Sequence, residues 1–86
     1  MTRVLKIHVS GYSQIIKQPM DFLTMRNKLN NGDYNKLEIF QKDFELMCDN
    51  AMTYNTQDTI YYKTAKKLRA VGKGLLTQQR YLNKNN

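Results

Sequence analysis

Apolar side chains recur at helical spacing through the middle of the chain. They follow one another at steps of three and four residues, at Leu37, Phe40, Phe44, Met47, Ala51 and Tyr54. This spacing places one apolar stripe along a helix of about five turns. Just upstream, Asn35 and Glu38 have the spacing of a capping box, whose two side chains satisfy free backbone N–H groups. The pattern predicts a helix that begins after Asn35 and ends near Tyr54.

A shorter helix is predicted before this one. Asp21 suits the N-cap position, and Phe22, Met25 and Leu29 fall on one face of the helix that would follow. Gly32 comes next in an Asn-Asn-Gly-Asp segment, where glycine can adopt the left-handed conformation that ends many helices. We therefore expect a helix from Phe22 to the turn at Gly32.

A third helix is predicted over the C-terminal part of the chain. Its apolar stripe comprises Tyr61, Ala65, Leu68, Gly72, Leu75 and Leu82. Either Asp58 or Thr59 can cap its start. Gly72 lies on the stripe, where a missing side chain lets another helix approach closely, whereas Gly74 lies off it and costs roughly 1 kcal/mol relative to alanine. We expect residues 83–86 to form a frayed polar tail.

The rest of the chain carries weaker signals. Residues 11–19 are typical of a compact loop with one helical turn, ended by Pro19, and residues 1–10 specify neither helix nor strand. A chain of 86 residues makes one domain. We expect an all-α domain over residues 11–82, preceded by an unmatched segment. No apolar run approaches the roughly 18 residues of a membrane span, and no signal-peptide pattern is present, so a soluble intracellular protein is expected.

Charge is distributed unevenly along the chain. Residues 1–58 carry seven basic and seven acidic side chains, whereas residues 59–86 carry seven basic ones and no acid, and thus the whole net charge of +7. This is either a solvated helix face or a contact surface for a polyanion such as DNA, which gains from counterion release. The candidate DNA contacts are Lys63, Lys66, Lys67, Arg69, Lys73 and Arg80.

The residue types that carry catalysis or bind metals are sparse. Cys48 is the only cysteine and His8 the only histidine, so neither has a like partner for a disulfide or a metal site. The acids Asp43, Glu45 and Asp49 lie off the apolar stripe, and we expect them on a solvated face without a nucleophile beside them. We expect no enzyme, no metal and no cofactor.

Residues 50–62 combine the features of a ligand-binding corner. A helix end carries the carboxamide of Asn55, and the aromatic residues Tyr61 and Tyr62 follow a polar turn. Three blocks of sequence surround or include it: Gly11-Tyr12-Ser13-x-Ile15-Ile16-Lys17-x-Pro19-Met20-Asp21-Phe22, Phe44-x-Leu46-Met47-Cys48-Asp49-Asn50-Ala51-Met52-Thr53-Tyr54-Asn55, and Asp58-Thr59-x-Tyr61-Tyr62-Lys63-x-Ala65-Lys66-Lys67. In this order and spacing they resemble the bromodomain family, over about residues 11–76.

The resemblance implies a left-handed bundle of four helices whose loops frame a pocket for acetyl-lysine. It makes the side-chain amide of Asn55 the donor of a hydrogen bond to the acetyl carbonyl. The hydroxyl of Tyr12 would reach the same carbonyl through a water. Ala51 and Tyr54 would line the wall, and Tyr61 would stand at the gatekeeper position. An apolar slot with one amide donor accepts a neutral acetylamide and rejects a charged ammonium, which would lose its hydration there.

Each of these residues also has a purely structural interpretation. Asparagine is a common helix C-cap, so the sole role of Asn55 could be to end its helix. Tyr54 and Tyr61 fall on apolar stripes and could be core residues, and Tyr12 could be a packed loop aromatic. The resemblance favours the pocket.

The chain departs from the family pattern at its start. Only ten residues precede the Gly11 block, so we expect a bundle lacking most or all of the first of four helices, with Val4, Ile7 and Val9 as a substitute wall. The missing helix would expose an apolar face drawn from Phe40, Phe44, Met47, Leu68 and Leu75. Such a face predicts self-association, a molten state or a missing partner, and impaired ligand binding by a truncated domain.

The functional expectations follow from the resemblance. It implies a nuclear reader of acetylated histone tails in chromatin regulation, with SWI/SNF-type remodelling complex subunits as partners and no membrane. One alternative is a basic helical module that binds DNA non-specifically, with nucleosomal DNA as its partner. A second alternative is a scaffold domain whose apolar face docks another helix.

Overall fold

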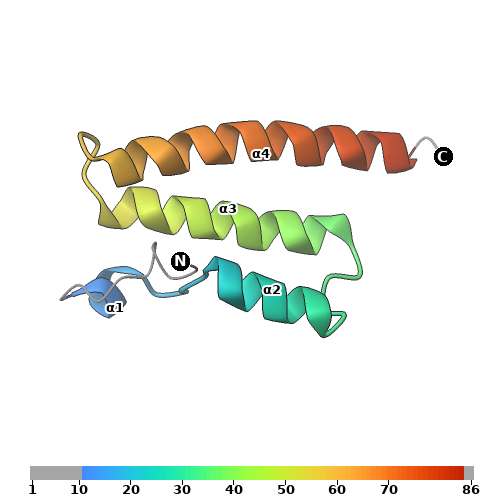
Figure 1. Ribbon diagram of the computed structural model, residues 1–86, viewed down its shortest axis with the longest axis horizontal. Coiled ribbons are helices and arrows are strands. Elements are labelled where there is room, and N and C mark those ends of the chain that lie inside the picture. Colours follow the sequence, from blue (N-terminus) through green and yellow to red (C-terminus); the bar gives the residue numbers. More distant parts are fainter. Residues whose placement is uncertain (1–10, 85–86) are drawn as a thin grey trace.

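The computed structural model describes residues 11–84, which fold into four helices and contain no strand (Figure 1). The helices are α1 (Tyr12–Ile15), α2 (Phe22–Asn30), α3 (Leu37–Tyr54) and α4 (Ile60–Lys84). The predicted all-α fold is confirmed. The expectations for residues 1–10, including His8 and a wall of Val4, Ile7 and Val9, lie outside the described residues.

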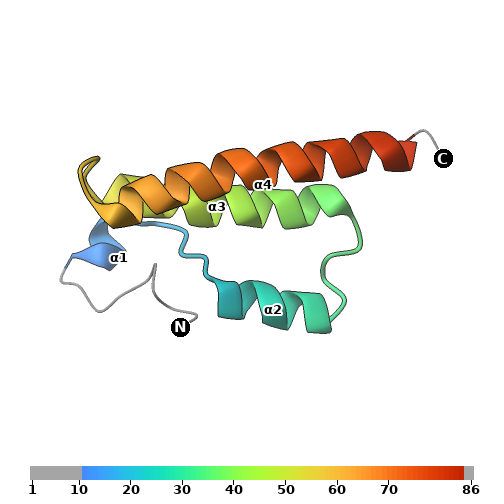
Figure 2. The ribbon, with the colours of Figure 1, turned by 45° about the horizontal axis from the view of Figure 1, so that its top comes forward.

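Helix α3 is the centre of the fold. It lies between α2 and α4 in Figure 1 and runs antiparallel to α4, while α1 lies near its C-terminal end. Figure 2 shows α4 lying along α3, with α2 apart from α4. Three longer helices match the expected bundle without a long first helix. Because α3 has neighbours on two sides, its side chains form most of the core.

The two ends of α2 follow the sequence prediction. At its start the Asp21 carboxylate accepts a hydrogen bond from the backbone N–H of Thr24 at 2.8 Å. At its end Gly32 has φ +80°, the left-handed conformation that glycine adopts without steric cost. The predicted N-cap and the predicted terminating glycine are both confirmed.

The predicted capping box of α3 is wrong. The N-cap residue is Lys36, with an extended backbone and no side-chain capping bond, so the helix begins at Leu37. Glu38 is then too close to the N-cap to serve as the partner of Asn35. It instead forms an ion pair with Arg80 of α4, with N and O 3.6 Å apart. A contact from the neighbouring helix thus replaces the local one.

Of the two predicted caps of α4, Thr59 bonds to the helix. Its hydroxyl oxygen accepts a hydrogen bond from the backbone N–H of Tyr62 at 3.2 Å, and its carbonyl accepts one from Lys63. Asp58 accepts a bond from the hydroxyl of Thr56, which lies within the turn. The helix continues to Lys84, past the predicted start of a frayed tail at residue 83.

The most deeply buried residues lie along α3. Met47, Cys48 and Ala51 are fully buried, and Ala65 of α4 is 2% exposed. At another point of the contact between α3 and α4, an ideal Cβ on Gly72 would overlap the ring of Phe44. The prediction that Gly72 admits a close helix neighbour is therefore confirmed.

Of the acids of α3 that were expected on a solvated face, Asp49 is exposed, whereas Asp43 and Glu45 are partly buried. Glu45 and Asp49 both pair with Arg69 of α4, at 3.3 and 2.7 Å. Asp43 pairs with Lys28 of α2 at 2.5 Å and accepts the hydroxyl of Tyr34 at 2.7 Å. The prediction fails for Asp43 and Glu45 because their positions beside the stripe face α2 and α4, whose cations pair with them.

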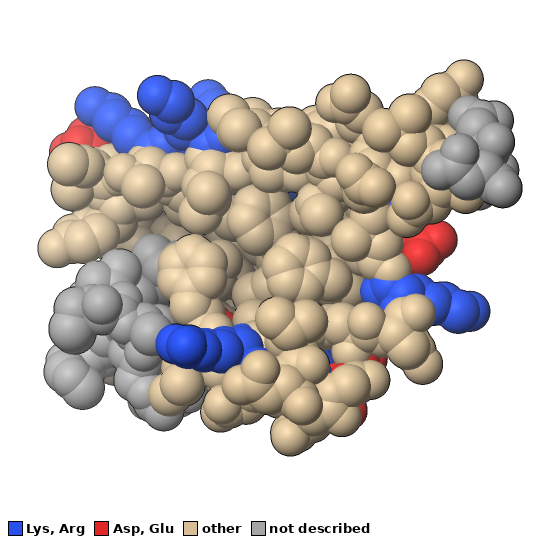
Figure 3. Space-filling view, turned by 45° about the vertical axis from the view of Figure 1, so that its right-hand side comes forward, with Lys and Arg blue, Asp and Glu red and all other residues tan. Residues whose placement is uncertain are grey.

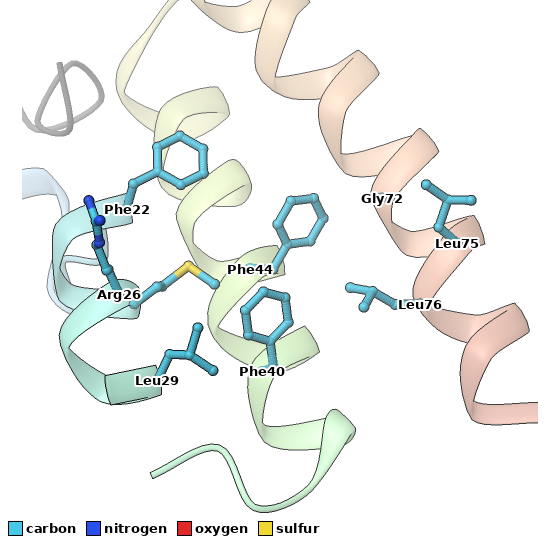
Figure 4. Close-up of a pocket in the computed structure, with 9 residues that line it drawn as sticks. Phe22, Arg26, Leu29, Phe40, Phe44, Gly72, Leu75 and Leu76 are labelled. Carbon is cyan, nitrogen blue, oxygen red and sulfur yellow. The ribbon is translucent and has the colours of Figure 1, made fainter. Parts of the chain in front are cut away.

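An apolar groove of about 420 Å³ lies between α2 and α4, with α3 as its floor (Figure 4). It is lined by Phe22, Met25, Arg26, Leu29, Phe40, Phe44, Gly72, Leu75 and Leu76. Of the residues expected on an exposed face, Phe40, Phe44 and Leu75 line this groove. Phe44 is nevertheless only 8% exposed, and Leu68 is partly buried against the core cluster. Met47 does not line the groove, because it is fully buried in the cluster with Met25. No helix within residues 11–84 is long and apolar enough to cross a membrane.

We expect the stability of the fold to depend on the ionisation of Cys48. Burial, followed in size by the charge of Asp49, raises the pKa of its thiol to about 11. Between the unfolded pKa near 9 and the folded value, the unfolded chain ionises while the native thiol stays neutral, so stability falls as pH rises. Wild type should lose about 2 kcal/mol more of its unfolding free energy than Cys48→Ala over this range.

Urea unfolding at about pH 8 and at about pH 11 measures this difference. Burial raises the pKa of Tyr12 and Tyr34 as well, so both proteins should lose stability at the upper pH. Equal losses in wild type and Cys48→Ala would contradict the assignment to the thiol.

Candidate functional site

The C-terminal end of α3 and the short helix α1 bring the predicted site residues together. The rings of Tyr12 and Tyr54 are tilted against each other, with centroids 4.9 Å apart. This spacing is typical of a favourable aromatic pair. Tyr12 is 7% exposed and Tyr54 half-buried, so the pair presents one partly accessible aromatic surface beside Asn55.

The hydroxyl of Tyr12 is buried without a hydrogen-bond partner among the described residues. Burial, and then the charges of Asp21 and Tyr54, raise the pKa of this phenol. The group therefore stays neutral and keeps its proton at neutral pH. A buried hydroxyl without a partner costs about 1 to 3 kcal/mol, so an acceptor from a ligand or a water is favoured at this position.

Asn55 is the C-cap of α3. Its backbone N–H and its side-chain Nδ2 both donate to the carbonyl of Ala51, at 3.1 and 2.8 Å. The capping interpretation of Asn55 is thus confirmed, but it does not use up the amide. The NH₂ group carries two hydrogens and the side-chain oxygen is an acceptor, so one donor and one acceptor remain. Asn55 is half-buried, so part of the residue faces solvent.

The other two residues assigned by resemblance differ in exposure. Ala51 is fully buried, so it lies behind the site and supplies the carbonyl that orients Asn55. Tyr61 is 47% exposed and lies in the first turn of α4, beyond the turn that follows Asn55. The structure therefore packs Tyr12 on Tyr54, which precedes Asn55 in the sequence, with Ala51 fully buried and Tyr61 at the surface.

Asn50 is a residue of this region that the sequence analysis did not single out. It is 8% exposed, and its Nδ2 donates to the backbone carbonyl of Gln18 at 2.8 Å. Its position between Met47 and Tyr54 puts a polar side chain on the buried face of α3. A carboxamide at helical spacing within an apolar stripe was the available signal.

The candidate DNA contacts fall into two groups. Arg69 and Arg80 point into the contact between α3 and α4, where both pair with acids of α3. The four lysines are exposed, namely Lys63, Lys66, Lys67 and Lys73. Figure 3 shows basic side chains gathered over the first half of α4. The exposed basic surface of α4 is therefore formed by lysine rather than arginine.

Metal-binding side chains do not cluster in the part of the chain that the structure describes. Within residues 11–84, no group of three or more histidine, cysteine or acidic side chains is arranged to hold an ion. The candidate site is thus composed of neutral donors and aromatic surface.

Comparison with known proteins gives consistent matches. The family model described as Bromodomain matches residues 8–67. Bromodomain-containing protein 7 of Gallus gallus is 57% identical over 70 residues, which cover 81% of this chain and 11% of that protein. The Homo sapiens protein of the same name is 56% identical over the same length and shares. Bromodomain-containing protein 9 of Homo sapiens is 54% identical over 69 residues, covering 80% of this chain and 12% of the relative.

The family match includes every residue that the resemblance placed in the acetyl-lysine site. The family match begins at residue 8, slightly before the start predicted at Gly11. The matched region is only 11 to 12% of the length of these relatives. With more than half of its length matched by the family model and over 50% identity to these proteins, the chain belongs to the bromodomain family.

Proposed function

We propose that this chain is a non-catalytic reader that binds acetyl-lysine at the corner of Tyr12, Tyr54 and Asn55. Bromodomains are generally acetyl-lysine readers in chromatin. The observation that carries the proposal is the packing of Tyr12 on Tyr54, the residue that precedes Asn55, which gives the region two neutral donors. The Asn55 amide is held in orientation by Ala51, and the buried Tyr12 hydroxyl lacks a partner among the described residues.

The chemistry of acetyl-lysine fits these donors. Its carbonyl oxygen can accept the second N–H of Asn55 directly and the Tyr12 hydroxyl through a water. Because the amide is trans, its N–H points away from Asn55 and stays accessible to water. Its methyl group and stem are apolar and can pack on the rings of Tyr54 and Tyr61. The carbonyl oxygen then has two donors, and the apolar atoms lie on aromatic surface.

The biological setting is part of the proposal. Acetylated histone tails in the nucleus are the proposed ligands, and SWI/SNF-type remodelling subunits the proposed partners. The matched relatives are much longer than this chain, so the partners of their other regions do not transfer with the match.

The apolar groove supports a further part of the proposal. We infer that the isolated chain binds acetyl-lysine more weakly than a bundle in which a fourth helix covers the groove. When the groove between Phe40 and Leu75 is uncovered, α2 and α4 have little contact across it. The loop before α2 connects it to α1, so α2 and α1 can move together. The same groove favours the scaffold alternative, in which it docks another helix.

The test is calorimetric titration of acetylated histone-tail peptides into wild type and Asn55→Ala. Loss of the donor leaves the ligand carbonyl unsatisfied in a half-buried site, so affinity should fall about 10- to 100-fold. Asn30→Ala is the matched control, since Asn30 is exposed on α2 away from the site. Both variants are compared at a temperature at which each is folded, because Asn55→Ala also removes a C-cap bond.

A second candidate function is non-specific DNA binding through the exposed lysines of α4. Four cations on one helix, with no acid in the described part of α4, favour contact with phosphates. This function predicts binding that ignores acetylation, survives Asn55→Ala and falls steeply between two salt concentrations. Those results would replace the reader proposal rather than refine it.

A further inference from the structure

We propose that Asn50 is a positioning residue of the acetyl-lysine site. It holds the segment between α1 and α2 against α3 and thereby keeps Tyr12 beside Tyr54. The expected effect of Asn50 on ligand affinity rests on the proposed function. The structural part of the inference, the hold on the loop, stands on contacts within the chain.

The bond from Asn50 joins two parts of the chain 32 residues apart. The side chain of Asn50 is 8% exposed, and its Nδ2 lies 2.8 Å from the carbonyl oxygen of Gln18. The side chain of Gln18 itself is exposed. The loop is therefore held at this point through its backbone, immediately before Pro19, which has no N–H to contribute.

Apolar anchors lie on both sides of this bond. Ile16 is 4% exposed and Met20 is 9% exposed, whereas the three residues between them are exposed. The loop thus touches the bundle at its two ends, and Asn50 fixes the carbonyl in the middle. We call this loop from Ile16 to Met20 the arch. Without the Asn50 donor, the carbonyl of Gln18 in the arch would have to turn toward water.

The position of Asn50 on α3 connects this arch to the ligand site. Asn50 and Tyr54 are four residues apart and so share one face of the helix. Tyr12 precedes the arch by a single helical turn, and its carbonyl accepts the N–H of Ile16 at 2.8 Å. A displaced arch would carry α1 with it and open the contact between the Tyr12 and Tyr54 rings. Asn50 therefore acts on the ligand through Tyr12.

Two substitutions of Asn50 separate the donor from the volume. Asn50→Asp keeps the shape and replaces the N–H donor by an oxygen that repels the Gln18 carbonyl. Asn50→Ala removes both shape and donor, and the isosteric variant covers the case in which alanine does not fold. Gly72→Ala is the control, because it perturbs the contact of α4 with Phe44 and does not touch the loop.

The first readout needs no ligand. Amide hydrogen exchange of the Ile15 and Ile16 N–H groups, both bonded within α1, is compared with exchange of core amides in α3. Both Asn50 variants should speed exchange in α1 at least about tenfold relative to α3, since α1 opens without global unfolding. Gly72→Ala should speed exchange of the α3 core amides by lowering global stability and leave exchange in α1 nearly unchanged. An equal change in the Asn50 variants would overturn the proposed hold on the loop.

The second readout is affinity for an acetylated peptide, at a temperature at which all variants are folded. Asn50→Asp and Asn50→Ala should each bind at least about tenfold more weakly, with Gly72→Ala within about twofold of wild type. Unchanged affinity beside faster exchange in α1 would overturn the positioning role. A wild-type chain that does not distinguish acetylated from unmodified peptide would instead overturn the proposed function, while the exchange result would still decide the hold on the loop.

Discussion

A peptide carrying acetyl-lysine is expected to bind at least about 100-fold more tightly than the same peptide with unmodified lysine. The reason is the character of the polar atoms at the site. Asn55 offers an N–H and Tyr12 an O–H, whereas an ammonium group is itself only a donor. Unmodified lysine would therefore lose hydration without finding an acceptor matched to its charge.

The carboxylate of Asp21 lies near Tyr12 but does not alter this expectation. Asp21 contributes to the raised pKa of Tyr12, so its charge acts near the hydroxyl. It is 1% exposed, however, and accepts the backbone N–H of Thr24 as the N-cap of α2. A lysine ammonium cannot reach it without breaking the start of that helix. An ionised group that stays unpaired in a half-buried site costs several kcal/mol, more than the factor of 100 requires.

Calorimetric titration with three matched peptides measures the preference. They carry acetyl-lysine, lysine or norleucine at one position, and norleucine keeps the apolar stem without charge or carbonyl. The acetylated peptide should bind most tightly, norleucine should be intermediate, and lysine should be weakest. Equal binding of norleucine and acetyl-lysine would show that the Asn55 and Tyr12 donors contribute nothing. Equal binding of lysine and acetyl-lysine would remove the reader function.

Local signals predicted the helices well where the partner groups are close in sequence. The cap at Asp21 uses a backbone N–H three residues away, and the turn at Gly32 needs only a left-handed residue. The same holds for Thr59, which caps α4 through Tyr62. These bonds are part of the short-range pattern, so the sequence alone specifies them.

Predictions failed where a distant partner competes with the local one. Asn35 and Glu38 have the spacing of a capping box, but Glu38 pairs with Arg80, which is 42 residues later in the chain. The prediction that the acids beside the α3 stripe are solvated also considered only local spacing. Asp43 instead meets Lys28 of α2. Neither pairing can be read from periodicity, because it depends on which helices become neighbours.

The candidate site was predictable in its residues but less so in their roles. The family resemblance selected Tyr12 and Asn55, and the structure places Tyr12 on Tyr54. Ala51 was predicted at the ligand wall; the structure shows it fully buried, with its carbonyl accepting the side-chain N–H of Asn55. Asn50 was missed because a polar residue within an apolar stripe was assigned no task. Its partner is a backbone carbonyl, which has no sequence signature.

Alanine substitution at the two glycines of α4 is expected to change stability in opposite directions. At Gly72 an added methyl group meets the ring of Phe44, with Cε2 2.6 Å from the ideal Cβ. Forcing an extra carbon into this contact should destabilise the fold by about 1 to 3 kcal/mol. At Gly74 nothing lies within 4 Å of the added methyl, so only the helix propensity changes, and stability should rise by about 1 kcal/mol.

The pair is a matched test because both changes add one methyl group to the same helix. For a domain of this size each kcal/mol shifts the melting temperature by about 4 to 8 °C, so thermal unfolding should separate the variants by at least about 8 °C. The Phe44 ring borders the apolar groove and can swing into it, which places the expected loss at Gly72 toward the lower end. Phe44→Leu should therefore relieve part of the loss in Gly72→Ala, because the shorter side chain vacates the space that the new methyl needs. A stabilised Gly72→Ala variant would mean that α3 and α4 do not pack as closely as the glycine permits.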